Sequence, residues 1–234
     1  MINNKTILCL MLARSGSKGL RAKNIKSLLG KPLIYYTIKA VKESSIFNRF
    51  ILSTDSEEIA QVGKEYGVEV PFLRPKELAQ DNSIASDAIV HALKWVEKHD
   101  KKYDYVQYIF PTSPLKTSED ILNGIKILLE KDADMVISVC ETDHPKFWSN
   151  VLPENNSLKN FVSPKYRQKN RQELPKTYRI NGGIYVAKWD VFYYKKDFFE
   201  QDTYAYIMPR ERSIDIDSHL DFKLAELVMA DDIK

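Results

Sequence analysis

The sequence predicts an α/β protein built on a mainly parallel β-sheet. Short apolar runs alternate along the chain with amphipathic segments, and the first of these runs stops abruptly at a Gly/Ser cluster. Short continuous apolar runs are typical of buried strands, whereas apolar residues at three- and four-residue spacing are typical of helices. Strands that alternate with helices favour an α/β layer, in which ligands bind beyond the carboxyl ends of the strands.

The first half of the chain contains three expected strands and three expected helices. Ile7–Leu12 is a buried strand because it is short, continuous and apolar. A helix follows over 32–43, with Pro32 in its first turn, where the missing N–H is harmless. The next helix, over 57–66, ends before Gly67, which suits the position after a helix. The other expected elements are strand Arg49–Ser53, helix 83–98 and strand 105–110.

The second half begins in the same way and then departs from the pattern. A helix begins at Ser118 with Glu119 and Asp120 in its first turn, and strand 135–140 follows. Residues 144–177 are polar, basic and interrupted by prolines. A segment of this length without regular structure is unusual inside a compact domain, so we expect it to have a function of its own.

Composition excludes several classes of protein. The 234 residues suit one domain, and the net charge of only +3 argues against a nucleic-acid-binding face. The two cysteines lie in apolar runs, which predicts buried thiols in a reducing compartment. The apolar run near the start is too short to cross a membrane. We therefore expect a cytoplasmic protein that binds neither nucleic acid nor membrane.

The stretch "TILCLMLARSGSKGLRAKN" is the first candidate site. Its glycines, Gly16 and Gly19, let backbone N–H groups approach an anion closely, and it follows the carboxyl end of the first strand. It contains neither of the common phosphate-loop motifs, so a solvated basic turn is an equally good interpretation. Its positive charges are Arg14, Lys18, Arg21 and Lys23.

The second candidate site is "SIDID", near the C-terminus. Strand character resumes over 178–189, around Asn-Gly-Gly, and "SIDID" is expected to be a short strand that enters a final helix. Asp215 and Asp217 are two residues apart, so in an extended segment their carboxylates share one face and suit a hard divalent cation such as Mg²⁺. The alternative is that Asp217 or Ser218 caps the helix while Asp215 pairs with a basic side chain.

Three further motifs follow expected strands or lie in loops. Thr112 and Ser113 in "FPTSP" offer hydroxyls to a ligand, although a Pro-bracketed turn is the simpler interpretation. "STD" over 53–55 is best interpreted as a strand-to-helix loop with a capping residue. Arg74 precedes a proline, which holds it in an extended loop where it can clamp oxygens or remain a surface charge. The four histidines lack the spacing of a metal site.

Seven motifs together resemble one family, the CMP-sialic acid synthetases or acylneuraminate cytidylyltransferases. They occur in register over nearly the whole chain, and their number makes the resemblance specific. The motifs are "ARSGSKGLRAKN", "LGKPLIYYTI", "STDSEEIA", "LRPKELAQD", "PTSP", "RQELPKTYRINGGIY" and "SIDID".

The resemblance implies an activity and an assembly. The family transfers CMP from CTP to the C2 hydroxyl of a nine-carbon sugar acid and releases pyrophosphate, with Mg²⁺ as cofactor. Its fold is a Rossmann-like α/β nucleotidyltransferase domain, here expected over 1–234, with 144–177 as a dimerisation extension. The implied partners are CTP, the sugar acid and a second copy of the chain that shares its active sites.

The resemblance also implies roles for individual residues. Lys23, Arg14 and Asp217 would be catalytic, and Asp215 and Asp217 would bind Mg²⁺. The implied nucleotide-binding residues are Leu12, Ala13, Arg14, Lys23, Asn24, Arg74 and Thr112. The implied sugar-binding residues are Phe110, Arg171, Tyr185, Phe198 and Phe199, with Arg171 reaching into the partner's site.

Two departures from the family pattern bear on the sugar. Phe110 stands where many members have a glutamine, and in "HPKFWSN" Phe147 stands at the usual lysine position, with Lys146 one place earlier. Phenylalanine donates no hydrogen bond and suits a methyl or deoxy position. The "HPKFWSNVLPENNSLKNF" stretch resembles the bacterial CMP-legionaminic acid synthetase branch, so we expect an N,N'-diacetyllegionaminate-type substrate.

Other outcomes remain open from the sequence. N-acetylneuraminate, pseudaminate and Kdo are the alternative sugar acids. A catalytically silent nucleotide-binding protein on the same fold is the alternative of a different class, because a fold alone does not establish a function.

Overall fold

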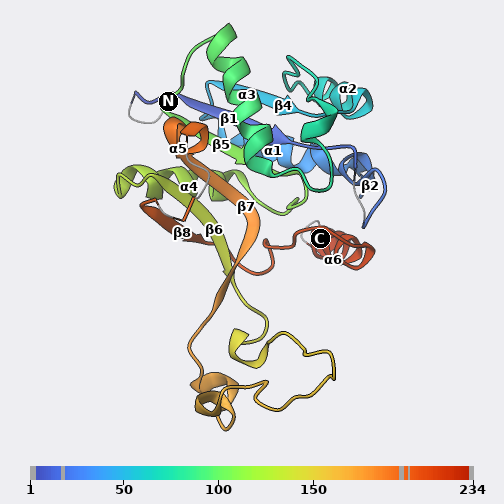
Figure 1. Ribbon diagram of the computed structural model, residues 1–234. Helices are drawn as coiled ribbons and strands as arrows, with labels where there is room; N and C mark the ends of the chain where they lie inside the picture. The colour runs from blue at the N-terminus through green and yellow to red at the C-terminus, as the bar shows by residue number, and fades with distance from the viewer. Residues whose placement is uncertain (1–3, 17–18, 195–197, 200, 232–234) are drawn as a thin grey trace.

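The computed structural model describes residues 4–16, 19–194, 198–199 and 201–231. Its centre is a six-stranded sheet in the order β4-β1-β5-β7-β6-β8 (Figure 1). β1 pairs in parallel with β4 and β5, and β6 pairs in parallel with β8, whereas β7 runs antiparallel to both of its neighbours. The strands are β1 (Ile7–Leu12), β4 (Arg49–Ser53), β5 (Tyr105–Ile109), β6 (Met135–Glu141), β7 (Tyr178–Lys188) and β8 (Thr203–Ile207). The predicted α/β layer with a mainly parallel sheet is confirmed.

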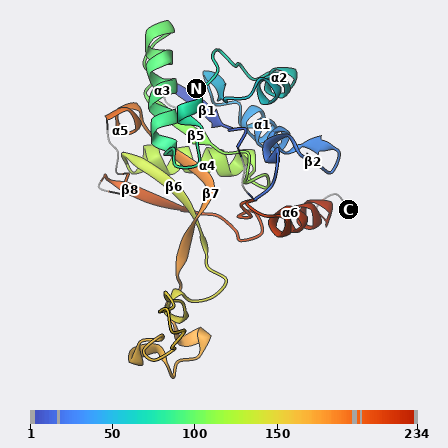
Figure 2. The same ribbon diagram turned by 45° about the vertical axis from the view of Figure 1, so that its right-hand side comes forward.

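Helices cover both faces of the sheet (Figure 2). Successive side chains of a strand point to opposite faces, and β1 shows this division. Ile7, Cys9 and Met11 pack with α1, α2 and α4, while Leu8, Leu10 and Leu12 pack with α3 and α5. The helices are α1 (Leu33–Ser44), α2 (Glu57–Glu65), α3 (Ala85–His99), α4 (Ser118–Glu130), α5 (Trp189–Tyr194) and α6 (His219–Asp231), and a small hairpin joins β2 (Ser27–Leu28) to β3 (Lys31–Pro32).

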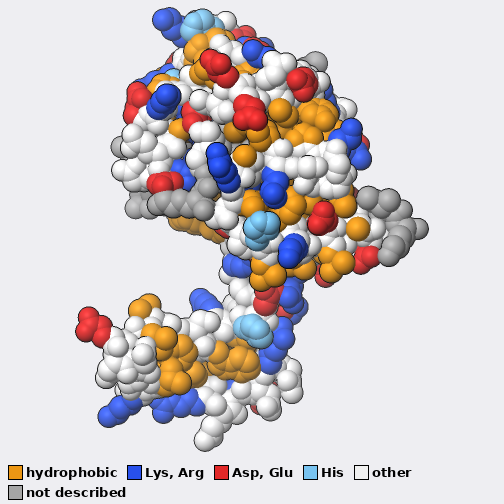
Figure 3. All heavy atoms as spheres, turned by 90° about the vertical axis from the view of Figure 1, so that its right-hand side faces the viewer, with side chains coloured by type: hydrophobic (Ala, Val, Ile, Leu, Met, Phe, Trp, Pro, Cys, Tyr) orange, Lys and Arg blue, Asp and Glu red, His pale blue; other side chains and the backbone are white. Residues whose placement is uncertain are grey.

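Residues 144–177 form an arm that extends away from the sheet. Figure 1 shows them as a separate lobe that continues from β6 and returns into β7, and Figure 3 shows the narrow neck that joins the lobe to the body. The regular structure of this arm is three short 3-10 turns, at Lys146–Trp148, Pro164–Tyr166 and Arg171–Glu173. Val151, Leu152 and Leu158 are exposed on it. The arm therefore presents apolar side chains that its own chain leaves in contact with water.

One expectation for the C-terminal part was wrong, and one strand, β8, was not predicted. "SIDID" is an extended loop rather than a strand, because its neighbours are the turn after β5 and the loop after β1 instead of a strand edge. The edge of the sheet is occupied by β8, whose alternating pattern was not recognised, and α5 follows β7 directly. Within the described ranges no helix combines the length and the apolar character needed to span a membrane.

Candidate active site

A cleft lies at the carboxyl ends of β1 and β5, where an α/β sheet is expected to bind ligands. Its volume is about 430 Å³. Three cationic side chains, Arg14, Lys23 and Arg74, line it, together with the carboxylates of Asp81 and Asp217. Leu12, Asn24, Phe110 and Thr112 also contribute to its walls. The sequence motifs that follow β1 and β5 therefore converge on one cavity with Arg74 and Asp217.

The loop after β1 is held in place by its neighbours. The Ala13 N–H donates to the Ser53 carbonyl at 3.2 Å, and the Asn24 side-chain amide donates to the Arg14 carbonyl at 2.8 Å. Asp55 accepts a hydrogen bond from the Ser15 N–H at 2.8 Å. Asp55 in "STD" thus holds the basic loop in place, a role that the sequence did not indicate. The capping residue of α2 is the next residue, Ser56. Lys18 lies outside the described residues.

Lys23 and Arg14 bond to different walls of the cleft. The Lys23 ammonium donates to the Ile216 carbonyl at 2.6 Å and to the Asp217 carboxylate at 2.9 Å. The Arg14 guanidinium donates to the Gln80 carbonyl at 2.6 Å. The Lys23 side chain is only 11% exposed, so its charge is shielded from water and directed at the acidic loop.

Arg74 is a buried cation rather than a surface charge. Its guanidinium donates to the Ser53 hydroxyl at 3.0 Å and to the Ser53 carbonyl at 2.6 Å. Burial lowers the pKa of Arg74 to about 10, and the nearby Arg14 acts in the same direction while Asp55 opposes it. At neutral pH the group keeps its charge, and few water molecules compete with a ligand for it.

The acidic pair lies beside Lys23, and its two carboxylates differ in exposure. The side chain of Asp217 is 80% exposed, whereas Asp215 is half-buried with one carboxylate oxygen, Oδ1, that is buried and has no hydrogen-bond partner within the described residues. Burial raises the pKa of Asp215 and the charge of Asp217 adds to this effect, although the hydrogen bond from Thr112 opposes it. A carboxylate oxygen without a partner, beside a second carboxylate, suits a divalent cation.

The final helix is capped by its own residues. The Ser218 hydroxyl accepts the Asp221 N–H at 3.3 Å, and the Asp221 carboxylate accepts the N–H groups of Ser218 at 2.7 Å and Asp217 at 3.1 Å. This reciprocal pairing is a capping box. The side chain of Asp217 is therefore not used for capping and remains available at the cleft.

The side chains of the acidic pair supply only part of the coordination shell that Mg²⁺ requires. The described residues contain no group of three or more His, Cys, Asp or Glu that could hold a metal ion. Mg²⁺ commonly takes one or two protein carboxylates and completes its shell with water and substrate phosphates. Asp215 and Asp217 fit that mode, in which the nucleotide must supply further oxygens.

Phe110 connects the cleft to an aromatic cluster. Its ring lies 5.5 Å from the Tyr108 ring and 6.1 Å from the Tyr185 ring, and Tyr108 and Tyr185 stack at 4.5 Å. Burial and the charge of Asp215 raise the pKa of Tyr185 to about 12. Tyr185 is therefore neutral at physiological pH and lies beside the acidic pair. The part of the site expected to receive the sugar is therefore aromatic, and Phe110 is the member of this cluster that lines the cleft.

Three of the expected sugar-binding residues lie away from this cleft within the chain. Phe198 packs against Phe192 at 5.2 Å, and Phe199 is 67% exposed. Arg171 lies in the projecting arm, where it lines a different hollow with Glu141 and Pro145. The structure thus brings together the expected nucleotide and metal residues but not these three.

Lys116 is a site residue that sequence reasoning missed. Its ammonium is buried behind Phe110, where it donates to the Phe110 carbonyl at 2.6 Å and to the Thr37 hydroxyl at 3.0 Å. Burial lowers the pKa of Lys116 to about 7, although the charge of Asp215 opposes the shift. Nothing in the sequence distinguishes this lysine from the exposed ones, because its burial depends on the tight turn between β5 and α4.

A comparison with protein families decides the assignment. A model of the family described as cytidylyltransferase matches residues 8–230. The chain belongs to the cytidylyltransferase family. This family membership confirms the resemblance on which the site residues were predicted.

Relatives of this cytidylyltransferase act on different sugar acids. It is 37% identical over 221 residues to the N-acylneuraminate cytidylyltransferase of Escherichia coli, covering 94% of this chain and 51% of that protein. It is 34% identical to the CMP-N,N'-diacetyllegionaminic acid synthase of Legionella pneumophila, covering 95% and 96%. It is 30% identical to a pseudaminic acid cytidylyltransferase of Campylobacter jejuni, covering 94% and 95%. The chain spans about half the length of the first of these relatives and nearly all of the other two.

Solved structures confirm the nucleotidyltransferase fold. CMP:2-keto-3-deoxy-manno-octonic acid synthetase complexed with CTP superimposes with a TM-score of 0.73 at 13% identity, covering 97% of this chain and 99% of that one. The 4-diphosphocytidyl-2C-methyl-D-erythritol synthase of Anaerococcus prevotii gives a TM-score of 0.66 at 14% identity, with the same coverage. At such low identity these likenesses concern the fold alone.

Proposed function

We propose that this cytidylyltransferase transfers CMP from CTP to the C2 hydroxyl of a nine-carbon sugar acid and releases pyrophosphate. The observation that carries the proposal is the convergence of the basic loop, Arg74 and the acidic pair on one cleft. A cation-lined cleft at the carboxyl ends of the strands suits a nucleoside triphosphate. The named activities of the relatives support the same substrate classes.

The chemistry assigned to the chain is mainly positioning and charge neutralisation. Phosphoryl-type transfer needs the attacking and leaving oxygens in line and the charge on the phosphates stabilised. Arg14 and Lys23 hold the triphosphate, and Lys23 stabilises the negative charge that develops on the leaving pyrophosphate. Asn24 keeps the loop in the required shape through its bond to the Arg14 carbonyl. Arg74 and Thr112 complete the nucleotide side of the cleft.

Mg²⁺ is the proposed cofactor, held by Asp215 and Asp217 together with the nucleotide. When bound, it draws charge from the phosphates and helps to orient them. Lys23 bonds to Asp217 in this structure. Because the same carboxylate is assigned to the metal, Lys23 is expected to leave it for the triphosphate when the substrate complex forms.

The proposed acceptor is an N,N'-diacetyllegionaminate-type sugar acid. The support is Phe110, which lines the cleft, is backed by Tyr108 and Tyr185, and donates no hydrogen bond, so it favours an apolar position on the sugar. Tyr185 is therefore proposed to shape the sugar pocket, whereas Phe198 and Phe199 lie away from this cleft within the chain and are not assigned to it. Relatives with three different sugar acids show that the family tolerates such variation.

A homodimer with shared active sites is proposed for the assembly. The arm of residues 144–177 exposes apolar side chains and projects from the body, as expected of a segment that packs on a second copy. Arg171 on this arm is proposed to reach the sugar acid in the partner's cleft. The buried free thiols Cys9 and Cys140 support a reducing, cytoplasmic location.

A substrate panel tests the proposed function. Pyrophosphate release is measured with CTP, with and without Mg²⁺, and with diacetyllegionaminate, N-acetylneuraminate, pseudaminate or Kdo as the acceptor. We expect Mg²⁺-dependent release with a nine-carbon acid and the highest kcat/KM with diacetyllegionaminate. A preference for N-acetylneuraminate of more than about tenfold, or 1.4 kcal/mol, contradicts the acceptor assignment. CTP binding without turnover on any acceptor indicates the catalytically silent alternative.

A further inference from the structure

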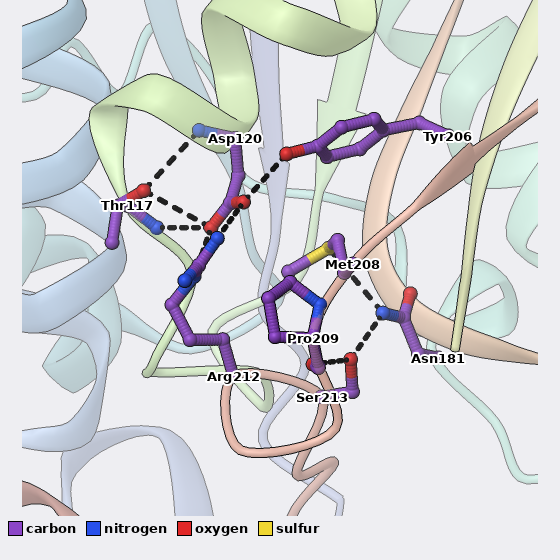
Figure 4. Close-up of polar contacts among 8 residues, drawn as sticks. All are labelled: Thr117, Asp120, Asn181, Tyr206, Met208, Pro209, Arg212 and Ser213. Atoms are coloured by element: carbon purple, nitrogen blue, oxygen red, sulfur yellow. Dashed lines mark hydrogen bonds and ion pairs between the residues drawn. The ribbon is translucent and has the colours of Figure 1, made fainter. Parts of the chain in front are cut away.

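A buried carboxylate, Asp120, organises the turn that precedes the acidic pair. It lies in the first turn of α4 and is fully buried. The Arg212 guanidinium donates to both of its oxygens, at 3.0 and 2.8 Å, and the Tyr206 hydroxyl donates at 2.8 Å (Figure 4). The Thr117 N–H and hydroxyl donate at 2.9 and 3.0 Å. Each carboxylate oxygen of Asp120 therefore accepts at least two hydrogen bonds.

The Asp120–Arg212 pair has the geometry of a strong ion pair. Burial alone would raise the pKa of Asp120, but the hydrogen bonds from Arg212, Thr117 and Tyr206 outweigh it and keep the pKa below its ordinary value. Two parallel N–H donors on one carboxylate fix orientation as well as distance. Asp120 is the buried member of the pair and the Arg212 side chain is 35% exposed, so removing Arg212 leaves a buried charge uncompensated, which is costly.

A second anchor holds the other side of the same turn. The Ser213 hydroxyl donates to the Pro209 carbonyl at 2.6 Å and accepts the Asn181 amide at 2.8 Å. Asn181 is buried in β7 and also accepts the Ser138 hydroxyl from β6. Figure 4 shows the two anchors on opposite sides of the turn, with Arg212 extending to α4 and Ser213 facing β7.

The anchored turn leads directly into the acidic pair. Asp215 follows Arg212 by three residues, and the next residue, Ile216, donates its N–H to the Thr112 carbonyl at 2.8 Å. The Asp215 carboxylate is placed against Gly182, where an added Cβ would lie 2.9 Å from its Oδ2. A short segment fixed at both ends leaves the Asp215 side chain little freedom.

We propose that the Asp120–Arg212 ion pair is the positioning device that sets Asp215 for the divalent cation. The inference rests on the proposed function, because that function assigns Asp215 to the metal. Arg212 is not among the described residues that line the cleft, and its guanidinium bonds to Asp120, so it acts through the turn. Residues that orient metal ligands through hydrogen bonds affect metal affinity although they do not contact the metal.

The test is metal binding in the presence of CTP, measured without an acceptor. Mn²⁺ replaces Mg²⁺, and the signal of free Mn²⁺ is followed by electron paramagnetic resonance. We expect Arg212→Met to weaken Mn²⁺ binding by about tenfold or more, while CTP affinity in metal-free buffer is unchanged. Arg212→Lys, which keeps the charge but not the two parallel bonds, should recover part of the affinity.

Arg210→Met is the matched control. Arg210 lies in the same turn but pairs with Asp143 on the arm side, not with α4. Its substitution should leave Mn²⁺ binding at the wild-type value. Equal binding by Arg212→Met and wild type overturns the inference, as does an equal loss in Arg210→Met. If Arg212→Met fails to fold, Arg212→Lys decides: weakened Mn²⁺ binding supports the inference, and wild-type binding overturns it. Failure of the wild type to bind Mn²⁺ with CTP contradicts the proposed function instead.

Discussion

The charge of Lys23 is the residue-scale feature on which the proposed reaction depends most. The ammonium is largely shielded and lies 2.9 Å from Asp217. Replacement by methionine keeps the length of the side chain and removes the charge that stabilises the leaving pyrophosphate. We predict that Lys23→Met lowers kcat about 100- to 1,000-fold, as for other donors to developing anions.

Arg21 provides the control for Lys23. It lies two residues earlier in the same basic loop, but it is exposed and does not line the cleft. Arg21→Met should therefore retain kcat within about twofold, because an exposed charge outside the site contributes little. Steady-state pyrophosphate release checks both variants, and an equal loss in both would assign the effect to the charge of the loop as a whole.

Lys116 predicts a dependence of stability on pH. Its pKa is about 7 in the folded protein and near 10.5 in the unfolded chain, so the unfolded chain binds more protons between these values. Stability must then rise with pH across this window, by up to about 1.4 kcal/mol per pH unit. We predict that the free energy of unfolding of wild type relative to Lys116→Met increases from pH 7.5 to 9.5 in urea titrations.

The exposed Lys126 on α4 serves as the comparison for this measurement. Wild type relative to Lys126→Met should show no such rise, because a solvent-exposed lysine has a similar environment in both states. A pH-independent difference for Lys116→Met would mean that the ammonium is not desolvated in the folded protein.

At the scale of elements, Gly182 in β7 determines the space available to Asp215. Its φ is +73°, a left-handed conformation that favours glycine, and an added Cβ would lie 2.9 Å from the Asp215 carboxylate. We predict that Gly182→Ala destabilises the protein by about 1–2 kcal/mol through backbone strain. It should also raise the Mg²⁺ concentration needed for half-maximal pyrophosphate release, because Asp215 must move.

Substitution of Gly30 distinguishes the cost of backbone strain from the effect on the Mg²⁺ requirement. Its φ is +79°, but no atom lies within 4 Å of the added Cβ. Gly30→Ala should therefore carry a similar backbone cost with an unchanged Mg²⁺ dependence. If the two variants respond alike to Mg²⁺, the contact between Gly182 and Asp215 has no functional consequence.

The elements themselves were largely predictable where local signals were strong. β1 and β4 have the predicted bounds, and α1 begins after Pro32, because uninterrupted apolar runs and a proline in the first turn are local features. The loop after β1 was predictable as a candidate site, whereas "SIDID" was misassigned because an extended chain resembles a strand when its neighbours are unknown.

Features that depend on long-range packing were not predictable. Asp120 was interpreted as a helix-terminal charge, but it is buried by Arg212 and Tyr206, which lie more than eighty residues later. The reversed direction of β7 likewise depends on the arm that precedes it, which returns the chain from the far end of β6. Sequence periodicity does not contain this information.

At the scale of the whole molecule, the arm predicts complementation between inactive variants. In the proposed homodimer with shared sites, co-expression of Lys23→Met with Arg171→Ala would produce heterodimers in which one site lacks both residues and the other has both. If Arg171 acts in the partner's site, about a quarter of wild-type activity returns in a random mixture of dimers, each with two equivalent sites. Activity no higher than that of the separate variants would place Arg171 in its own chain's site or outside the reaction.

Phosphorus NMR of the reaction of CTP with the sugar acid and Mg²⁺ tests the proposed CMP transfer directly. We predict that the α-phosphorus moves into a CMP-sugar diester while an equal amount of pyrophosphate appears. Asp217→Asn should abolish both signals, whereas Glu211→Gln, an exposed carboxylate four residues before Asp215, should retain them. Formation of CDP and phosphate, or unchanged turnover in Asp217→Asn, would contradict the central claim.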